Sequence, residues 1–545
     1  MTEQITLAEY LGHRLRQAGV GHLFGVPGDF NLTLLDHLTK VPDLQWTGSP
    51  NELNAGYAAD AYARSRGLAA LVTTYGVGEL SAFNAVAGSA AEDVPVVHIV
   101  GSPSTAAVTQ GRKVHHTLAD GVFDRFSTAF AQVVVHQETV TADRAAEQID
   151  AVLLAATTHR RPTYLSIPMD LATLPLDAGR LTTPLRSLSD PAGLRDLTAD
   201  LTRRLTGATK PVFVVGHLVP RFDLSAAVLE AARAANIPLV TSLAAKGAID
   251  ASQPLHRGDY AGTMVDASTA ALVAEADLVV ELGTVASDVL TGFFTHRVED
   301  VRDIHFSATR AGEHEVLFAD AVRVLAQVCA TVRFPDREYP ARPPRTPVPV
   351  DPDDALTQES LWQTIETWLP SGTAVLADTG TAFFGSVRMT LPDDTVYVGQ
   401  PVWNSIGYAL PATLGLGLAE PDRRPVLFVG DGAAQMTVQE LSTIVRAGLT
   451  PVVVLINNDG YTIERALQSP KAAYNDIAAW DWTALALALG GGLVSTRTVW
   501  TNGELEAALA EAPTDEMVLL EVVLDMFDSP PLLQELAGRN GGGAQ

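Results

Sequence analysis

Two short segments of the chain combine residue types that could hold a phosphate-bound metal ion. Val426-Leu-Phe-Val-Gly-Asp-Gly432 places a Gly-Asp-Gly turn after an apolar run, and Pro451-Val-Val-Val-Leu-Ile-Asn-Asn458 delivers an amide. Mg²⁺ prefers hard oxygen ligands in octahedral geometry and keeps substrate phosphates in its shell. The carboxylate of Asp431, the amide oxygen of Asn458 and the carbonyl of Gly460 would supply three such ligands. Gly-Asp-Gly alone is a frequent tight turn, so the second segment carries the argument.

Acids and imidazoles elsewhere in the chain could transfer protons, although each also has a plain structural explanation. Glu52 follows Ser-Pro-Asn at an expected helix start, where capping and the helix dipole would account for a carboxylate. Asp29 follows Pro-Gly as an ordinary turn residue, and the adjacent His115 and His116 by themselves suit a solvated turn. No zinc site is indicated by the other histidines that we considered, which are expected to be structural: His13, His22, His37, His98, His136 and His159.

Parallel α/β layers are the architecture that would position such residues. Short apolar runs end at or near Gly, Glu or Asn and alternate with longer helical stretches, which is typical of parallel sheets covered by helices. Two Pro-containing passages interrupt the pattern and are expected to be extended linkers, Pro184–Pro191 and Pro340–Asp354. They divide the chain into predicted domains 1–188, 189–342 and 355–545. The clearest strand candidates are Val94–Val100, Pro211–Val215, Leu278–Leu282, Val426–Val429 and Pro451–Ile456.

The outer two domains share a sequence pattern. In the first, Gly76-Val-Gly78 precedes a helical stretch and the apolar run after Pro95; in the third, Gly430-Asp-Gly432 precedes a helical stretch and the run after Pro451. Each unit is predicted to be a loop, a helix and a buried strand, so the outer domains are expected to share one topology. Coincidence between two common α/β units is the alternative. In the middle domain, strand-to-Gly turns form no full dinucleotide fingerprint, which favours plain α/β packing.

The bulk composition excludes several classes of partner. A formal net charge of −26 repels nucleic acid and anionic lipid, and the N-terminal segment lacks the pattern of a signal peptide. A cytoplasmic protein that binds neither nucleic acid nor membrane is therefore expected. Since Cys329 is the single cysteine of the chain, no internal disulfide and no cysteine-based metal cluster can form.

Taken together, these motifs resemble those of the thiamine diphosphate-dependent 2-keto acid decarboxylases, the family of pyruvate, indolepyruvate and branched-chain keto acid decarboxylases. The resemblance covers nearly the whole chain, and Ala61, where relatives usually have Gly, is a small departure. The matching segments are Phe24-Gly-Val-Pro-Gly-Asp29, Asn51–Arg64, His115-His116, Ala377-Asp-Thr-Gly-Thr381, Trp403-Asn-Ser-Ile406-Gly, Gly430-Asp-Gly432, Asn457-Asn-Asp-Gly-Tyr-Thr-Ile-Glu464 and Tyr474-Asn-Asp-Ile477.

The resemblance implies an α/β fold of three domains, in which two related cofactor-binding domains flank a central one. It implies a pyrimidine-binding domain, a central domain and a diphosphate-binding domain, with thiamine diphosphate and Mg²⁺ as cofactors. In the family the cofactor lies between the first domain of one chain and the last domain of another. A homodimer is therefore the expected minimum, and a homotetramer is the expected form.

The resemblance also implies the reaction, in which a 2-keto acid loses CO₂ and yields an aldehyde through a cofactor ylid and an enamine intermediate. Glu52 would hydrogen-bond the aminopyrimidine ring and set its imino form, and Ile406 would hold the cofactor in its bent shape. Proton transfer near the substrate is assigned to Asp29, His115, His116 and Glu464. The cofactor-binding set implied is Glu52, Thr381, Ile406, Asp431, Gly432, Ala433, Asn458, Gly460 and Tyr461, of which Asp431, Asn458 and Gly460 would hold the metal ion.

The substrate is the least determined part of this prediction. Val289, Phe383, Phe384 and Ile463 match positions that line the side-chain pocket in the family. Pyruvate-restricted relatives tend to have bulky aromatics where this chain has Val289, so branched-chain or aromatic 2-keto acids are expected. The alternatives are a pyruvate-preferring decarboxylase and a thiamine-dependent carboligase, and the pocket residues could instead be ordinary core. A catalytically silent homologue is disfavoured by the retained acidic and amide residues.

Overall fold

The computed structural model describes residues 4–297, 300–339 and 350–541. The chain forms two compact units, one of Met1–Leu188 with Leu414–Ala419, the other of Ser189–Thr413 and Glu420–Gln545. Within the described residues, no helix is both long and apolar enough to cross a membrane.

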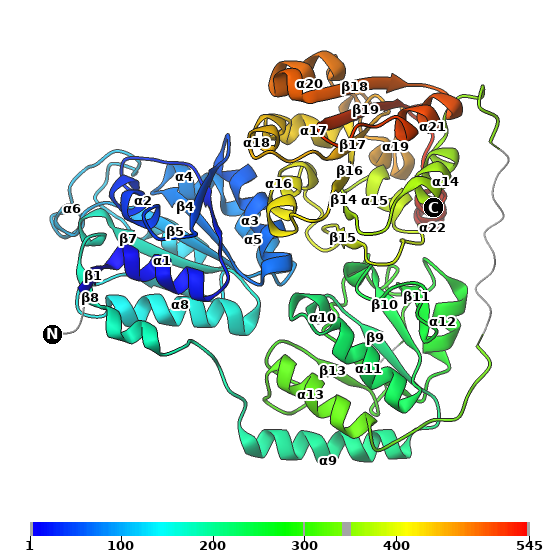
Figure 1. Ribbon diagram of the computed structural model, residues 1–545, viewed down its shortest axis with the longest axis horizontal. Helices are drawn as coiled ribbons and strands as arrows, with labels where there is room; N and C mark the ends of the chain where they lie inside the picture. Colours follow the sequence, from blue (N-terminus) through cyan, green and yellow to red (C-terminus); the bar gives the residue numbers. More distant parts are fainter. Residues whose placement is uncertain (1–3, 298–299, 340–349, 542–545) are drawn as a thin grey trace. The chain divides into compact units, whose positions relative to one another are not determined.

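A six-stranded parallel sheet is the centre of the first unit (Figure 1). Its strand order is β3-β2-β4-β5-β7-β6. The strands β1 and β8 form a separate antiparallel sheet of their own. The strands are β1 (Gln4–Thr6), β2 (His22–Gly25), β3 (Gln45–Gly48), β4 (Ala69–Thr74), β5 (Val96–Ser102), β6 (His136–Thr139), β7 (Thr163–Pro168) and β8 (Pro175–Asp177).

Helices of the first unit connect these strands, and three of them cover one face of the sheet. Apolar side chains of α1, α2 and α8 pack with those of β2, β4, β5 and β7 in one buried cluster. The helices are α1 (Leu7–Gln17), α2 (Leu32–Leu38), α3 (Glu52–Arg66), α4 (Val77–Ser81), α5 (Phe83–Ala91), α6 (Thr105–Thr109), α7 (Arg125–Phe130) and α8 (Ala145–His159).

The second unit begins with a five-stranded parallel sheet of order β11-β10-β9-β12-β13. Alternate residues of β9 face opposite sides: Phe213 packs with α9, α11 and α13, while Val212 packs with α12. Both faces of β9 are thus buried, which explains its unbroken apolar run. The elements are α9 (Pro191–Gly207), β9 (Pro211–Val215), α10 (Leu218–Arg221), α11 (Ser225–Ala235), β10 (Leu239–Ser242), β11 (His256–Tyr260), α12 (Ala267–Ala274), β12 (Leu278–Leu282), β13 (Ile304–Phe306) and α13 (Phe318–Cys329).

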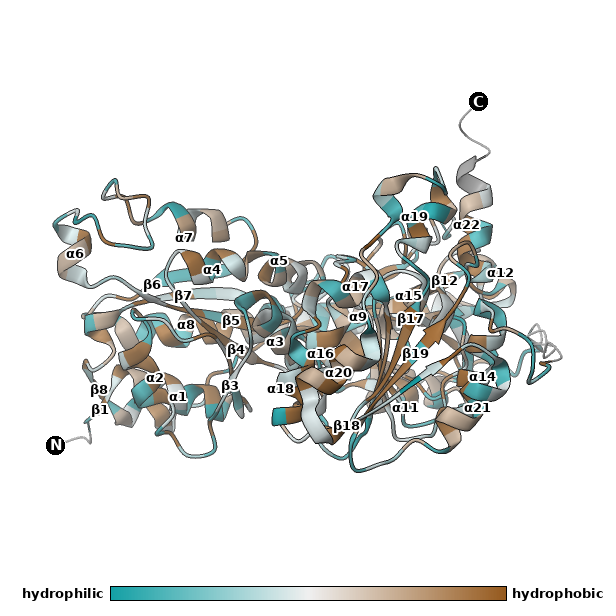
Figure 2. Ribbon diagram, turned by 90° about the horizontal axis from the view of Figure 1, so that it is seen from above, coloured by the Kyte–Doolittle hydropathy of each residue, from teal (hydrophilic) through white to brown (hydrophobic). Residues whose placement is uncertain are grey.

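A second six-stranded parallel sheet completes this unit, with order β15-β14-β16-β17-β19-β18. Figure 2 shows its central strands β17 and β19 as strongly hydrophobic. The elements are α14 (Gln358–Trp368), β14 (Ala374–Ala377), α15 (Thr381–Ser386), β15 (Val396–Val398), α16 (Ala409–Ala419), β16 (Pro425–Gly430), α17 (Asp431–Thr437), α18 (Glu440–Arg446), β17 (Val452–Asn457), α19 (Thr462–Leu467), α20 (Trp482–Gly490), β18 (Val494–Val499), α21 (Asn502–Ala510), β19 (Met517–Val523) and α22 (Pro531–Gly541).

The two six-stranded sheets have one topology. When the six strands of each sheet are numbered in chain order, both sheets have the order second, first, third, fourth, sixth, fifth, so β3-β2-β4-β5-β7-β6 matches β15-β14-β16-β17-β19-β18 position by position. The predicted repeat pairs β4 and β5 with β16 and β17, which are adjacent in their sheets. The expectation that the outer domains share a topology is therefore confirmed. Part of the predicted linker Pro340–Asp354 lies outside the described residues.

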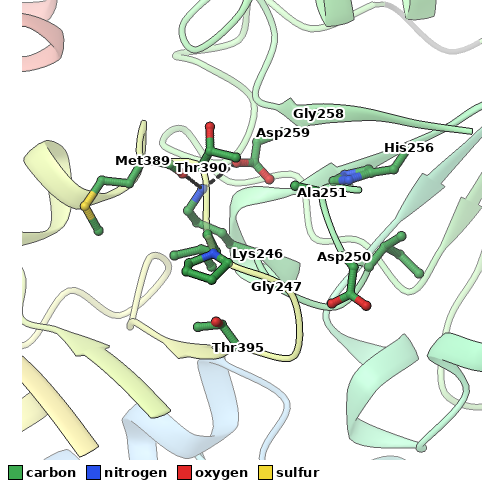
Figure 3. Close-up of a pocket in the computed structure, with 13 residues that line it drawn as sticks. Lys246, Gly247, Asp250, Ala251, His256, Gly258, Asp259, Met389, Thr390 and Thr395 are labelled. Atoms are coloured by element: carbon green, nitrogen blue, oxygen red, sulfur yellow. Dashed lines mark hydrogen bonds and ion pairs between the residues drawn. The ribbon is translucent and has the colours of Figure 1, made fainter. Parts of the chain in front are cut away.

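A buried ion pair joins the central sheet region to the last domain within the second unit (Figure 3). Lys246 Nζ donates to Asp259 Oδ2 at 2.6 Å and to the carbonyl of Met389 at 2.7 Å. Thr241 donates to the other carboxylate oxygen. Burial opposes ionisation of Asp259, but Lys246 and Thr241 outweigh it and hold the pKa of this carboxyl below its usual value. The pair borders a cavity of about 30 Å³, room for one water molecule.

Removing the positive charge of Lys246 should lower the free energy of unfolding of the chain. Lys246→Met is expected to cost about 3 kcal/mol, because it leaves the Asp259 carboxylate buried without its cation. Urea midpoints of the variant and the parent at neutral pH measure the difference. Adding Asp259→Leu to the same chain should recover most of the loss, since an apolar pair has no charge to desolvate. If Lys246→Met alone were as stable as the parent, the ion pair would have no role in stability.

Candidate active site

A hollow opens at the carboxyl ends of β14, β16 and β17, where parallel strands bring their following loops to one edge of the sheet. Most of the predicted cofactor-binding residues of the second unit line it, and Ile463 of the predicted substrate pocket lines it as well. The lining residues are Thr379, Gly380, Thr381, Ile406, Gly430, Asp431, Gly432, Ala433, Asn458, Gly460, Tyr461, Thr462 and Ile463.

The three oxygen ligands predicted for Mg²⁺ meet beside this hollow. The Asp431 carboxylate accepts the N–H groups of Gly432 at 2.7 Å and of Gly460 at 3.0 Å. One terminal atom of the Asn458 amide faces both Asp431 Oδ1, at 3.3 Å, and the Gly460 carbonyl oxygen, at 3.1 Å. If the amide nitrogen of Asn458 occupies that position, it donates to both oxygens. If the amide oxygen occupies it, the oxygens of Asp431, Asn458 and Gly460 converge on one point. A cation stabilises the second arrangement, so one rotation of the amide turns the cluster into a metal site.

The electrostatics of Asp431 agree with a cation ligand. Burial raises the pKa of Asp431 to about 6, although the N–H groups of Gly432 and Gly460 oppose the shift. A buried carboxyl of this kind lacks a countercharge, and a divalent cation would supply one. The donor set therefore fits Mg²⁺, and the open hollow beside Gly430, where an added Cβ would meet nothing within 4 Å, leaves room for a diphosphate.

The loop after Asn458 is held by Arg465, which the sequence did not indicate as a functional residue. Arg465 is buried and donates to the carbonyls of Asp459 and Pro470 and to the Asp476 carboxylate. The Tyr461 ring lies so close to Gly432 that an added Cβ would approach it to 2.6 Å. The Tyr461 ring therefore favours glycine at the third position of Gly430-Asp-Gly432, and Arg465 fixes the segment that carries Gly460.

Asp378 lies in one of the segments that match the family, but no role was predicted for it. It follows β14 directly, and its carboxylate accepts the N–H groups of Gly407 at 3.0 Å and of Ala409 at 2.8 Å. These bonds anchor the turn that presents Ile406 to the hollow, a turn in which Gly407 has a φ of +82°. Burial raises the pKa of Asp378 to about 7. A polar residue directly after a buried strand was the signal available in the sequence.

Asp378 should make the stability of the metal-free chain depend on pH. Its folded pKa of about 7 exceeds the unfolded value, so its contribution is fully present below the unfolded pKa and is lost as the pH rises toward 7. Relative to the parent, Asp378→Asn is expected to gain roughly 2 kcal/mol between pH 5 and pH 7. Urea midpoints of both proteins across this range test it.

A control without pH dependence is available in the same domain. Arg423 lowers the pKa of the exposed Asp394, so this carboxyl is ionised in both the folded and the unfolded chain above pH 5, and the stability difference between Asp394→Asn and the parent should stay constant from pH 5 to pH 7. If Asp378→Asn showed no pH-dependent difference from the parent, ionisation of the buried carboxyl would not be linked to folding.

In the first unit, the structure brings together three of the residues predicted to transfer protons. His115 Nε2 lies 2.7 Å from Asp29 Oδ2, and His116 Nε2 lies 3.8 Å from Asp29 Oδ1. Phe30 stacks flat against His115, with ring centroids 4.9 Å apart, and meets His116 edge-on. The adjacent histidines lie in an exposed turn, and within that turn both imidazoles face the Asp29 carboxylate.

Glu52 is the first residue of α3, as expected. The cap of this helix is supplied by Asn51, whose side chain accepts the N–H of Asn54 at 2.9 Å. Capping therefore does not account for the Glu52 carboxylate, which is half-buried. An added Cβ at Gly78 would come within 3.0 Å of Glu52 Oε1, so the glycine leaves space for this carboxylate.

The predicted substrate-pocket residues share one apolar cluster in the second unit. Val289, Phe383 and Phe384 are buried in it, and the half-buried Ile463 packs against it. The two phenylalanine rings meet edge to face with centroids 5.6 Å apart. Glu464 follows Ile463 in the first turn of α19 and is exposed. Side chains of α22, among them Leu532 and Leu536, complete the cluster.

Comparison with protein families defines the class of this chain. Three family models match successive parts of it: the thiamine pyrophosphate enzyme N-terminal TPP binding domain at residues 5–126, the central domain at 198–333 and the C-terminal TPP binding domain at 378–522. Thiamine pyrophosphate is another name for thiamine diphosphate. The chain thus has all three domains of a thiamine diphosphate enzyme.

Full-length relatives narrow this class. The chain is 41% identical to an alpha-keto-acid decarboxylase of Mycobacterium leprae, with 97% of this chain and 95% of the relative covered. It is 42% identical to the protein of that name from Mycolicibacterium paratuberculosis, with 97% and 96% covered, and 41% identical to that of Mycobacterium tuberculosis, with 98% and 97% covered. The chain belongs to the alpha-keto-acid decarboxylases, a family of thiamine diphosphate-dependent enzymes. The predicted family, enzyme class and three-domain α/β fold are confirmed.

Proposed function

We propose that the chain converts a 2-keto acid to an aldehyde and CO₂ without oxidation, using thiamine diphosphate and Mg²⁺. The observation that carries this proposal is the meeting of Asp431, Asn458 and the Gly460 carbonyl beside a hollow at the carboxyl ends of three parallel strands. When bound, the cofactor supplies a nucleophilic carbon and an electron sink for the departing CO₂. Asp431, Asn458 and Gly460 would hold the metal ion, and Thr381, Gly432, Ala433 and Tyr461, which line the hollow, would border the diphosphate.

The chain's own residues supply orientation and protons in this proposal. Ile406, whose turn is anchored by Asp378, would pack against the cofactor, and the Glu52 carboxyl would hydrogen-bond its aminopyrimidine ring and could hold or release a proton there. His115 is hydrogen-bonded to Asp29, His116 lies 3.8 Å from the same carboxylate, and we assign proton transfer to and from the substrate to these three residues. Glu464 is assigned to the same proton transfer, because it lies one residue beyond Ile463, which lines the hollow.

A cytoplasmic oligomer is part of this proposal, with a homodimer as the minimum and a homotetramer as the expected form. Val77 and Leu80 on α4 are 56% and 44% exposed. Large apolar side chains exposed side by side are typical of a surface that another subunit covers. Mass measurement in solution tests the assembly.

A panel of 2-keto acids tests the reaction. Purified protein is incubated with pyruvate, 4-methyl-2-oxopentanoate or phenylpyruvate, with and without thiamine diphosphate and Mg²⁺, and both CO₂ and aldehyde are measured. Equimolar CO₂ and aldehyde that depend on both cofactors are expected. Release of CO₂ with a coupled ketol product in place of free aldehyde would indicate a carboligase and contradict the proposal.

We further propose that branched-chain or aromatic substrates are preferred over pyruvate. What supports this is the apolar cluster of Val289, Phe383 and Phe384 against Ile463, which offers a hydrophobic surface next to the hollow. Each methylene buried there contributes about 0.8 kcal/mol, so the three additional carbons of 4-methyl-2-oxopentanoate give a preference on the order of 50-fold in kcat/KM.

Val289→Tyr is expected to remove most of that preference, because the larger ring fills space that a long side chain needs. The ratio of kcat/KM for 4-methyl-2-oxopentanoate to that for pyruvate should fall by about 10-fold or more. Val301→Tyr is the matched control, since Val301 is 92% exposed and the ratio should not change. A parent enzyme that prefers pyruvate would refute the substrate proposal alone.

A further inference from the structure

A cluster of nitrogen and oxygen ligands lies in the first unit, whereas the oxygen ligands at Asp431 belong to the second unit. One atom each of Asp29, His115 and His116 can be chosen so that all three lie within 4.8 Å of one another. The side chains are 48%, 60% and 30% exposed, so a hydrated ion can reach them. Residues 29 and 115 are 86 positions apart, which is why the sequence did not indicate the site.

The backbone brings the two imidazoles to the same side. Consecutive side chains of an extended segment point in opposite directions, but His116 has a left-handed φ of +59°. The ring centroids of His115 and His116 are consequently only 4.5 Å apart. Gly76 lies directly against this turn, since an added Cβ there would come within 2.0 Å of the His116 carbonyl oxygen. The backbone of the loop at the two histidines is therefore held in place.

We propose that Asp29, His115 and His116 bind a zinc-type divalent ion, with water in the fourth position. Tetrahedral zinc accepts imidazole nitrogen and carboxylate oxygen at about 2.0–2.2 Å, which separates the ligand atoms by roughly 3.3–3.5 Å. His115 Nε2 lies 2.7 Å from one oxygen of Asp29, His116 Nε2 lies 3.8 Å from the other, and one ligand atom of each residue lies within 4.8 Å of the others, so rotation of these exposed side chains would bring three ligand atoms to that separation. The negative net charge of the chain also favours cations.

The ligand types separate this site from the magnesium site. Mg²⁺ demands near-octahedral oxygen ligands and gives up its water reluctantly, whereas imidazole suits zinc, copper and cobalt. Zinc should therefore occupy the histidine pair even when Mg²⁺ saturates Asp431. Because the same side chains transfer protons in the proposed function, on which this consequence rests, zinc bound here should inhibit decarboxylation.

Calorimetric titration of the Mg²⁺-loaded holoenzyme with ZnCl₂ tests the site, with His115→Gln, His116→Gln and Asp29→Asn as variants. One ion per chain is expected for the parent. Each variant should bind at least about 10-fold more weakly, because losing a ligand costs no less than losing an outer-shell partner. Co²⁺ should give the intense visible absorption of a four-coordinate ion with the parent and not with the variants. His136→Gln, which alters an imidazole beside the single carboxylate of Glu138, should bind as the parent does.

The outcomes distinguish this site from the proposed function. No bound zinc, or equal binding by the parent and all three variants, would overturn the metal site and leave the decarboxylase proposal standing. Zinc bound at these residues with activity undiminished would keep the site and remove the inhibition, and it would contradict the proton-transfer role of Asp29, His115 and His116.

Discussion

Glu52→Gln is expected to reduce kcat by about 10³- to 10⁴-fold while the chain remains folded. The amide keeps the size and one hydrogen bond of the carboxyl, but it cannot exchange the proton that sets the tautomer of the aminopyrimidine ring. The fold should survive because Asn51, and not Glu52, caps α3. Exchange of the cofactor's thiazolium proton with solvent, followed by quenched-flow NMR, should slow in parallel with turnover.

A matched control separates this role from a general loss of charge. Glu359 lies in the first turn of α14 and is exposed, so Glu359→Gln changes the same atoms at a comparable helix position. Its turnover and proton exchange should equal those of the parent. Exchange that proceeds at the parent rate in Glu52→Gln would remove the carboxyl from cofactor activation, whatever the effect on kcat.

Elements whose two faces are buried could be predicted from the sequence almost to the residue. Pro211–Val215 and Leu278–Leu282 are strands with the predicted bounds, because helices cover both faces of their sheet and every position except Glu281 is apolar. The positions of Gly430-Asp-Gly432 and of Asn458 were also predictable, because each follows a buried apolar strand. They end adjacent parallel strands, and parallel strands deliver their carboxyl ends to one edge.

Residues that act through distant partners could not be predicted in this way. Arg465 matters because the chain returns to it at Pro470 and Asp476, and Asp378 because the turn at Gly407 folds back over it. Neither contact leaves a periodic pattern. The convergence of His115 and His116 depends on one left-handed residue, which neighbouring letters do not specify. Hydrophobic periodicity predicts sheets and helices, whereas loop conformation and long-range hydrogen bonds decide which polar groups meet.

Asp431→Ala is expected to weaken Mg²⁺ binding by at least about 10³-fold, and thiamine diphosphate should be lost with the metal. The substitution removes an anionic ligand of the kind that Mg²⁺ prefers. It also removes the acceptor of the Gly460 N–H, whose carbonyl is a second predicted ligand. Exhaustive dialysis of the reconstituted protein, followed by measurement of metal and cofactor content, tests the loss.

Asp431→Asn isolates the charge from the hydrogen bonds, because its amide oxygen can still accept one N–H group. This variant should lose most of the metal affinity while the loop keeps its conformation, and Asp459→Asn, at an exposed neighbouring position, should lose neither. In the parent, Mg²⁺ competes with a proton for Asp431, whose pKa burial raises to about 6, so affinity should fall about 10-fold per pH unit well below pH 6. Affinity that is constant from pH 7 to pH 5, or cofactor retained by Asp431→Ala through dialysis, would show that the metal ion binds elsewhere.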